Sequence, residues 1–444
     1  MPKIVLTTIG TLGDLHPFIA LALALKERGY HPVMAVAEDQ LDKARAAGLE
    51  AVAVLPSFES IRQRMGLSHD EAVRRLVNNQ RHMLEQVLLP ALSSCAEALD
   101  AVTEDATAII SSTFVLAAPI IAEKRRIPLI SVVLQPMAML SPHDPPHTPD
   151  FWMMRNAPDT VIGLWWNRAV YAAAREMLHR VYGRKIDPVR AVHALAPRGA
   201  RKMLDAGREA ALTLCCYSPQ FGPLPPDARA NARVVGFPIF DSRTGAPEAL
   251  DPELAAFMDA GPAPLVFTLG SFVVQDPRNF YAEAAETARR LGRRAVLLTG
   301  CDAPTRVEGD IFRCAYAPHS LLFPRASVII HHGGIGTTGQ ALRAGKPQLV
   351  VPHMGDQNDH AHRIQRMGIG YAIKPRRFSA DRAEPIIAEL LSNDSYRNTA
   401  AAIGARIARE RGADAGADAV VDYLEQRRDI RRTVHVTSAM AAVG

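Results

Sequence analysis

The stretch FPRASVIIHHGGIGTTGQALRAGKPQLVVPHMGDQ, residues 323–357, decides the fold class, because it carries a buried strand into a glycine-rich loop and a helix. The strand, Val328–Ile330, is a short β-branched run of the kind found inside a parallel sheet. His331 and His332 follow where this strand leaves the sheet, and several glycines then let the backbone approach a ligand before a helix that Thr337 opens. A helix N-terminus at this edge of a sheet favours an anion, so we expect a phosphate group there.

Length and composition indicate a globular protein of two domains. The 444 residues, 48% of them hydrophobic, suffice for two domains of about 200 residues each. The net charge of +5 comes from basic residues scattered along the chain, which excludes a nucleic-acid-binding surface. The cysteines show no CxxC spacing, which indicates free thiols in a reducing compartment, so we expect a cytoplasmic protein. The longest uncharged stretches, 106–122 and 127–142, are too short to span a membrane.

Strand-like and helical runs alternate in both halves of the chain. This alternation predicts an α/β fold of two doubly wound, Rossmann-like domains with a cleft between them. In the N-terminal half, strands are expected at 4–9, 33–37, 108–112 and 129–134, and a helix at 17–28. The expected parts are an N-terminal domain over 1–222, a linker over 223–262, a C-terminal domain over 263–408, and a helix and tail over 409–444 that pack back on the N-terminal domain.

Several motifs resemble those of the family 1 nucleotide-sugar glycosyltransferases, which have the GT-B fold. The motifs span almost the whole chain and are IGTLGDLHPFI (9–19), VGFPIFD (235–241), PLVFTLGS (264–271), AYAP (315–318) and HHGGIG (331–336). Within the family, the likeness is strongest to the rhamnosyltransferases of rhamnolipid synthesis, and sterol and polyketide glycosyltransferases share the N-terminal form. The resemblance implies an inverting, metal-independent enzyme that moves a hexose from a nucleotide diphosphate sugar to a hydroxyl group. It also implies that the N-terminal domain binds the acceptor and the C-terminal domain binds the nucleotide sugar.

The resemblance implies a donor site made mainly by the C-terminal half. His331 would donate a hydrogen bond to the diphosphate, and the amides of the glycine-rich loop would stabilise the charge that grows on it. Tyr316 would stack on the base, with the Ala317 backbone reading the base edge, and Asp356 would bind sugar hydroxyls. The residues implied to bind the donor are Gly13, Ser271, Tyr316, Ala317, His319, His331, Gly333, Gly334, Gly336, Thr337, Asp356 and Gln357.

No metal ion and no cofactor besides the nucleotide sugar is expected. The sequence has no Asp-x-Asp pair of the kind that metal-dependent transferases use. An alternative is a zinc site, but no cysteine completes a tetrahedral set with the nearby histidines, which are His331, His332, His353, His360 and His362. His332 is expected to be a satisfied core side chain, and Asp356 could instead cap the helix that follows it.

Catalysis is expected on the loop GTLGDLHP, residues 10–17. An acceptor hydroxyl must lose its proton as it attacks the anomeric carbon, and a positioned base accepts that proton. Many relatives have a histidine base where this sequence has Asp14, and the carboxylate that would orient such a histidine is replaced by Ser111–Thr113. Asp14 is therefore the expected base and His16 the second candidate. The alternative is that Asp14 only favours the N-terminus of the next helix by its charge.

The acceptor is expected to be hydrophobic, because a Met- and Trp-rich connection in the N-terminal half suits an adaptable apolar pocket. Candidate acceptors are a hydroxy-fatty-acid lipid, a sterol, a carotenoid, a polyketide or a phenol. A packed core loop is the alternative interpretation of this connection. The expected acceptor-binding residues are Met137, Met139, Phe151, Trp152 and Trp165.

The expected donor is of the dTDP-rhamnose or UDP-glucose type. Plant-type UDP-sugar enzymes carry a glutamate where this chain has Gly339, which favours a dTDP-linked sugar. Two other protein classes stay open, a Rossmann-type NAD(P)-dependent oxidoreductase and a non-catalytic sugar-nucleotide-binding subunit. We further expect a monomer or a homodimer, with peripheral contact at the inner face of the membrane.

Overall fold

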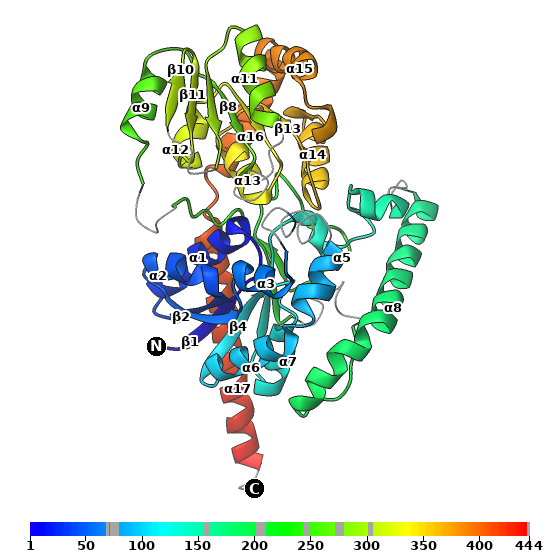
Figure 1. Cartoon of the computed structure of the whole chain (residues 1–444). Coiled ribbons are helices and arrows are strands. Elements are labelled where there is room, and N and C mark those ends of the chain that lie inside the picture. The colour runs from blue at the N-terminus through cyan, green and yellow to red at the C-terminus, as the bar shows by residue number, and fades with distance from the viewer. Residues whose placement is uncertain are drawn as a thin grey trace.

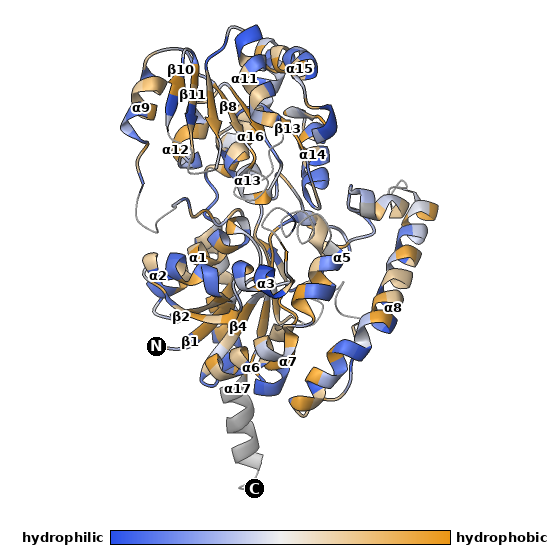
Figure 2. Ribbon diagram, in the orientation of Figure 1, coloured by the Kyte–Doolittle hydropathy of each residue, from blue (hydrophilic) through white to orange (hydrophobic). Residues whose placement is uncertain are grey.

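The strands form two separate sheets in the computed structural model, which describes residues 1–67, 71, 80–154, 160–200, 210–242, 248–270, 279–300 and 305–441. Figure 1 shows the sheets in two stacked domains, with the N-terminal half below and the C-terminal half above. Figure 2 shows hydrophobic strands in the middle of both domains and hydrophilic segments on many of the surrounding helices. The predicted α/β architecture of two doubly wound domains is confirmed.

The N-terminal sheet is parallel along its described strands, in the order β3-β2-β1-β4-β5-β6-β7. Short apolar runs form these strands because helices cover both faces, and Ile4, Val5 and Leu6 of β1 are all fully buried. The strands are β1 (Lys3–Thr7), β2 (His31–Ala37), β3 (Glu50–Leu55), β4 (Ala106–Ser112), β5 (Leu129–Val133), β6 (Leu212–Cys215) and β7 (Ala232–Val234). The helices are α1 (Leu12–Glu27), α2 (Leu41–Ala46), α3 (Phe58–Arg64), α5 (Gln80–Met83), α6 (Leu92–Val102), α7 (Ala117–Arg125) and α8 (Val161–Val192), with shorter turns η1 (Glu38–Gln40), η3 (Leu84–Leu88), η4 (Pro136–Met139) and η5 (Pro149–Met154).

The C-terminal sheet has the order β10-β11-β9-β8-β12-β13-β14, with only the β10–β11 pair antiparallel among its described strands. Its strands are β8 (Leu265–Thr268), β9 (Ala295–Leu298), β10 (Arg306–Glu308), β11 (Ile311–Cys314), β12 (Val328–His331), β13 (Gln348–Val350) and β14 (Gly370–Ala372). Its helices are α9 (Pro252–Asp259), α11 (Phe280–Arg290), α12 (His319–Leu322), α13 (Ile335–Arg343), α14 (Gln357–Arg366), α15 (Ala380–Ser392), α16 (Asp394–Ile407) and α17 (Gly412–Ala441), with turns η7 (Phe323–Arg325) and η8 (Pro375–Arg377). Within the described ranges, none of the helices combines the length and apolar character that crossing a bilayer requires.

The linker expected over 223–262 contains a strand of the N-terminal sheet, which corrects the predicted boundary. β7 pairs in parallel with β6, with Ala232 opposite Thr213. Three residues are too few to show the period of a strand, so the sequence pattern did not indicate it. The N-terminal domain therefore extends at least to Val234, and α9 precedes the first strand of the C-terminal domain.

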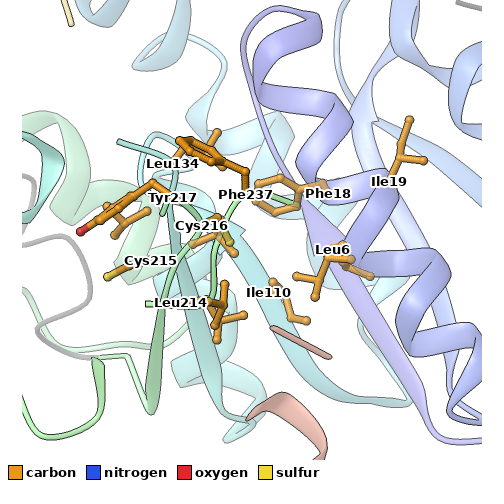
Figure 3. Close-up of a cluster of buried hydrophobic side chains, with 14 of the residues drawn as sticks. Leu6, Phe18, Ile19, Ile110, Leu134, Leu214, Cys215, Cys216, Tyr217 and Phe237 are labelled. Atoms are coloured by element: carbon orange, nitrogen blue, oxygen red, sulfur yellow. The ribbon is translucent and has the colours of Figure 1, made fainter. Parts of the chain in front are cut away.

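The buried core is continuous across the two domains. Figure 3 shows side chains of β1, α1, β4 and β6 gathered in one cluster with Phe237, which follows β7. The same cluster continues into the C-terminal domain through Ile335 and Leu342 of α13. A Cβ at Gly339 of that helix would lie 2.9 Å from Cδ1 of Phe237, so the glycine lets the segment after β7 pack closely on α13.

Helix α17 returns from the C-terminal domain and packs along α1. Ala417, Val420 and Leu424 of α17 are buried in the N-terminal core. Arg28, after the end of α1, pairs with Asp418 at 2.6 Å, but this pair is partly exposed and contributes ~0–1 kcal/mol. The buried apolar side chains therefore hold most of the contact.

A loop of the N-terminal domain is held on α14 of the C-terminal domain by charged hydrogen bonds. The backbone N–H of His147 donates to Oδ1 of Asp359 at 3.0 Å. Arg363 donates to Asp359 and to Asp144, each at 2.7 Å. The rings of His147 and His362 stack with their centroids 3.6 Å apart. Because Asp359 and Arg363 are buried, these bonds fix how the two domains face each other.

Truncating a core side chain of the central strand β4 should destabilise the N-terminal domain. Ile110 is fully buried, so Ile110→Ala is expected to lower the free energy of unfolding by ~2–5 kcal/mol in urea titrations. The control Ile430→Ala removes a side chain that is mostly exposed on α17 and should change it by less than ~0.5 kcal/mol. Equal effects of the two variants would contradict the placement of β4 in the core.

Candidate functional site

Two helix N-termini from different domains meet at the domain junction. Helix α1 begins at Leu12, helix α13 begins at Ile335, and the two helices contact each other. The two helices approach each other at a pair of glycines, since a Cβ at Gly336 of α13 would lie 3.7 Å from Cα of Gly13 of α1. The first-turn N–H groups of α13, which no side chain caps, and the positive ends of both helix dipoles therefore converge, which favours a bound anion.

Asp14 is held at the N-terminus of α1 by a capping box. The backbone N–H of Thr11 donates to Oδ2 of Asp14 at 2.7 Å, and the Thr11 hydroxyl donates to the same oxygen at 3.2 Å. The backbone N–H of Gly13 in turn donates to the Thr11 hydroxyl oxygen at 3.2 Å. Gly10 makes room for the carboxylate, because its φ is +136° and a Cβ there would lie 2.2 Å from Oδ2 of Asp14. The short loop after β1 thus fixes this carboxylate at the junction.

The electrostatic environment of Asp14 makes its carboxylate unusually basic. Burial raises the pKa of Asp14 to about 6, the hydrogen bonds from Thr11 lower it in part, and the negative charge of Asp356 raises it further. Burial also raises the pKa of Asp356, while the neighbouring His360 lowers it. Each domain therefore contributes one partly buried carboxylate to the junction.

His16 is a far weaker base than Asp14. Burial lowers the pKa of His16 to about 3, and the charge of Lys43 adds to this effect. Its ring packs edge-on against Phe240 with the centroids 5.5 Å apart, and its Nε2 is buried without a hydrogen-bond partner in the described part of the chain. A general base works best when its pKa lies near the working pH, so Asp14 is the better proton acceptor of the two.

His331 makes hydrogen bonds within the fold through both ring nitrogens, which argues against its expected contact with the diphosphate. It is the last residue of β12 and is fully buried. Its Nδ1 accepts from the backbone N–H of Gly333 at 3.1 Å, so its Nε2–H donates to Oε1 of Gln348, 2.9 Å away. Burial lowers the pKa of His331 to about 4, so the ring is neutral. Both ring nitrogens of His331 are thus hydrogen-bonded, and the side chain stabilises the glycine-rich loop through the bond from Gly333.

His332 has the free ring that the sequence analysis assigned to His331. It is buried, its Nδ1 has no hydrogen-bond partner among the described residues, and its ring lies between two glycines. A Cβ at Gly270 or at Gly334 would lie 2.4 Å from an atom of this ring, so these glycines make room for the imidazole. Burial lowers the pKa of His332 well below its usual value, which keeps the ring neutral with one N–H to donate.

The Asp356–Gln357 pair adjoins the glycine-rich loop at the start of α14. Asp356 occupies the N-cap position of α14, yet its side chain makes no capping hydrogen bond, so the capping alternative is wrong. Oε1 of Gln357 accepts from the backbone N–H of His353 at 2.8 Å. His360, one turn later, contacts the carbonyl oxygen of Gly333 through Nδ1 at 2.7 Å. The loop after β13 is thus tied directly to the loop after β12.

Tyr316 is held by a carboxylate from the segment that connects the domains. Its hydroxyl donates to Oδ1 of Asp241 at 3.5 Å, and Oδ2 of Asp241 accepts from the backbone N–H of Ser320 at 2.6 Å. Burial and the charge of Asp241 raise the pKa of Tyr316. His319 stacks on Phe323 with centroids 4.3 Å apart. Asp241 ends the motif VGFPIFD, so that motif could have indicated it, although the sequence analysis assigned it no role.

The expected acceptor residues are divided between the surface and the core, which argues against a single pocket formed by all of them. Trp152 and Trp165 are each 67% exposed. Met139 packs against the N-terminal core, with its sulfur 3.5 Å from that of Cys215. Phe151 lies in η5 next to the exposed Trp152 and does not join the core, and Met137 lies in η4. A tryptophan on the surface and a tryptophan in the core look the same in a sequence, so the sequence could not show which way Trp152 and Trp165 face.

A different apolar cluster lies beside the loop that carries Asp14. Ile9 of that loop packs with the side chains of α3, α5 and η3, around the buried Val87 and Leu88. Phe114, after β4, is 50% exposed and adds an apolar side chain at the same edge of the sheet. The partly buried members of the cluster are Ile9, Phe58, Ile61, Met65, Leu67, Met83, Leu84 and Leu116. This cluster is the better candidate for contact with an apolar ligand.

The remaining expected residues fall into two groups. Gly333, Gly334 and Thr337 form the loop and first turn of α13, and Ala317 is buried just before α12. Ser271 lies outside the described residues. Among the residues that the structure describes, no group of three or more His, Cys, Asp or Glu side chains is arranged to hold a metal ion.

Each half of the chain matches a known protein-domain family. Residues 4–139 match the glycosyltransferase family 28 N-terminal domain. Residues 302–426 match the erythromycin biosynthesis protein CIII-like C-terminal domain. The first match contains the Asp14 loop, and the second contains the glycine-rich loop and the Asp356–Gln357 pair.

Curated relatives and solved structures agree with these matches. The chain is 28% identical over 432 residues to the vancomycin aglycone glucosyltransferase of Amycolatopsis orientalis, covering 96% of this chain and 98% of that protein. It is 30% identical over 382 residues to glycosyltransferase GtfE of the same organism, covering 83% and 85%. A crystal structure of glycosyltransferase VinC in complex with dTDP matches with a TM-score of 0.68 and 17% identity, covering 96% of this chain and 100% of that chain.

Replacing Asp14 by asparagine should change how stability depends on pH. The pKa of Asp14 is about 6 in the folded protein and ~3.9 in an unfolded chain, so the folded state holds this proton more tightly. This carboxyl therefore makes the free energy of unfolding fall as the pH rises through that interval. In urea unfolding experiments, we compare the free energy of unfolding of Asp14→Asn with that of the wild type at each pH. The variant's value minus the wild-type value should increase by ~1 kcal/mol or more as the pH rises between those two pKa values. A constant difference would contradict the burial of this carboxylate.

Proposed function

Since this chain belongs to the nucleotide-sugar glycosyltransferases of the GT-B fold, we propose that it transfers a hexose from a nucleoside diphosphate to a hydroxyl of a hydrophobic acceptor. The observation that carries the proposal is the convergence of the α1 and α13 N-termini beside the unpartnered imidazole of His332. Such a region suits a diphosphate better than any neutral ligand. Family membership sets aside both other classes, an oxidoreductase and a non-catalytic subunit.

The donor diphosphate is held by the N-terminus of α13 and by His332. The neutral imidazole donates one hydrogen bond, and the first-turn amides of α13 donate others. As the bond between the anomeric carbon and the diphosphate oxygen breaks, these donors stabilise the charge on the leaving nucleotide. His331 supports the loop and does not contact the donor, and Asp356 binds hydroxyl groups of the sugar.

The acceptor hydroxyl is activated by Asp14. Its oxygen attacks the anomeric carbon from the face opposite the diphosphate, its proton passes to the Asp14 carboxylate, and the product has the inverted configuration. A pKa of about 6 leaves this carboxylate mostly ionised at neutral pH yet more basic than an ordinary aspartate. Each negative charge that approaches, such as the donor diphosphate, raises the basicity of Asp14 further, as Asp356 already does.

The substrates are a dTDP-linked or UDP-linked hexose, with dTDP-rhamnose first, and an apolar alcohol. The similar VinC is a dTDP complex and supports the first choice. The apolar cluster around Ile9 supports the second, because it borders the loop that carries Asp14. Transfer needs no metal ion, since the helix termini supply the positive field and the neutral His332 adds a hydrogen bond. Activity should therefore survive EDTA, and loss with EDTA followed by rescue with Mg²⁺ or Mn²⁺ would contradict this part of the proposal.

His332→Ala should lower kcat/KM for the true donor by ~10²-fold or more, because it removes one donor to the leaving diphosphate. Nucleotide release with a panel of dTDP- and UDP-sugars measures the rate, and calorimetric titration with dTDP and UDP measures affinity. The melting temperature without nucleotide should change little, because the variant breaks no hydrogen bond at Nδ1 of His332, which has no partner among the described residues.

The matched control is His331→Ala. It removes the hydrogen bonds to Gln348 and Gly333, so its main effect should be a lower melting temperature. If instead His331→Ala bound nucleotide poorly with unchanged stability while His332→Ala bound it normally, the assignment of the two histidines would be reversed.

Asp14→Asn should abolish the acidic limb of the pH–rate profile. In the wild type, kcat/KM should fall as the pH drops below about 6, because Asp14 becomes protonated. The variant should transfer sugar ~10²-fold more slowly at neutral pH, with unchanged dTDP affinity. His16→Gln is the control and should keep the wild-type profile. A deep loss in His16→Gln with a mild one in Asp14→Asn would identify His16 as the base.

A further inference from the structure

An exposed apolar surface lies on the N-terminal domain and includes none of the residues of the proposed donor and catalytic sites. It consists of Trp152, Met153, Val161, Ile162, Trp165 and Trp166, from η5 and the first turns of α8, and is called the α8 surface. Ile162 is 82% exposed, and both Trp152 and Trp165 are mostly exposed. Large apolar side chains gathered in this way mark a contact surface, because single exposed residues are common but clusters are not.

The α8 surface is an ordered part of the fold. The indole N–H of Trp166 donates to the carbonyl oxygen of Met153 at 2.8 Å, which joins η5 to α8. The Thr160 hydroxyl caps α8 by accepting from the N–H of Gly163 at 3.0 Å. The opposite face of the same turns is buried, including Gly163 and Asn167. The exposed face is therefore presented by a helix whose orientation is fixed.

The charges of α8 indicate that its partner is anionic. The helix carries six Lys and Arg residues against two Asp and Glu residues. Its two acids are engaged, since Glu176 pairs with Arg180 at 2.9 Å and Asp187 accepts two backbone N–H groups. The exposed charged residues of α8 are all basic. They are Arg168, Arg180, Arg184 and Lys185. Tryptophan and aliphatic side chains at one end of a helix whose exposed charged residues are basic suit the interface of an anionic bilayer.

A second copy of the chain fits this surface less well, because it would bring the same four cations to the contact.

The surface is also connected to the domain junction. Two residues before η5, His147 donates its backbone N–H to Asp359 and stacks on His362 of the C-terminal domain. Figure 1 shows the N-terminal end of α8 at the level where the two domains meet.

We propose that the α8 surface docks the enzyme on an anionic membrane. Trp152, Ile162 and Trp165 enter the interfacial layer, and the exposed arginines and lysine of α8 contact lipid phosphates. The enzyme would then take its acceptor from the bilayer, and this consequence alone rests on the proposed function. Docking itself involves no residue of the donor or catalytic site.

The test is cosedimentation with vesicles, at low ionic strength, of equal phosphatidylglycerol and phosphatidylcholine or of phosphatidylcholine alone. The wild type should bind the anionic vesicles at least ~10-fold more tightly, and added salt should weaken this binding. Ile162→Glu combined with Trp165→Glu should lower the affinity ~10-fold or more. The control Val307→Glu adds one negative charge at a 53%-exposed position on β10, outside the α8 surface, and should bind as the wild type does.

Melting-temperature shifts with dTDP show whether each variant keeps its fold and donor site. The proposal would be overturned if the wild type ignored anionic vesicles, or if the double variant bound them as the wild type does. It would also be overturned if sedimentation equilibrium showed a dimer that the double variant abolished, because the surface would then contact a second copy. Vesicle binding requires no turnover, so a failure to transfer sugar would leave this result unchanged and would count only against the proposed function.

Discussion

The structure depends on the contact between the N-termini of α1 and α13. Both helices direct the positive ends of their dipoles to one region, α13 adds uncapped backbone N–H groups, and two glycines, Gly13 and Gly336, let the helices approach without side chains between them. This arrangement needs the two domains in a fixed relation, which the buried Asp359–Arg363 bonds and the continuous core provide. An anion bound between the helices interacts with both domains at once, so donor binding and domain contact support each other.

The histidines and glycines of the motif have separate physical tasks. His331 closes β12 by accepting from Gly333 and bonding Gln348, and His332 stands over Gly270 and Gly334 with no partner of its own. Both rings are kept neutral by burial, so they act as hydrogen-bond donors or acceptors and not as cations. The charge at the junction comes instead from Asp14 and Asp356, one from each domain. Burial makes both harder to ionise, and that same burial makes Asp14 a competent base.

Sequence patterns predicted the fold well, because buried parallel strands are short apolar runs, as at Val328–Ile330. Boundaries were less accurate: α1 starts at Leu12, well before Pro17, because the Thr11–Asp14 capping box begins the helix. The sequence analysis assigned the diphosphate to His331 and the core to His332, but successive side chains at a strand end point to opposite sides, and only the structure shows which ring keeps a nitrogen without a partner among the described residues. Trp152 and Trp165 were misassigned for a similar reason. Their apolar character indicates a contact surface, but only the fold shows that the surface faces outward.

The central claim is that His332, and not His331, contacts the donor diphosphate. Nuclear magnetic resonance of the protein labelled with ¹⁵N-histidine tests this claim most directly, with the two signals assigned from His331→Gln and His332→Gln. On addition of dTDP or UDP, the ring nitrogen resonances of His332 should shift as its N–H gains an anionic acceptor. Those of His331 should stay near their positions in the free protein, because its bonds to Gly333 and Gln348 persist. A shift confined to His331, with the signals of His332 unchanged at saturating nucleotide, would contradict the account.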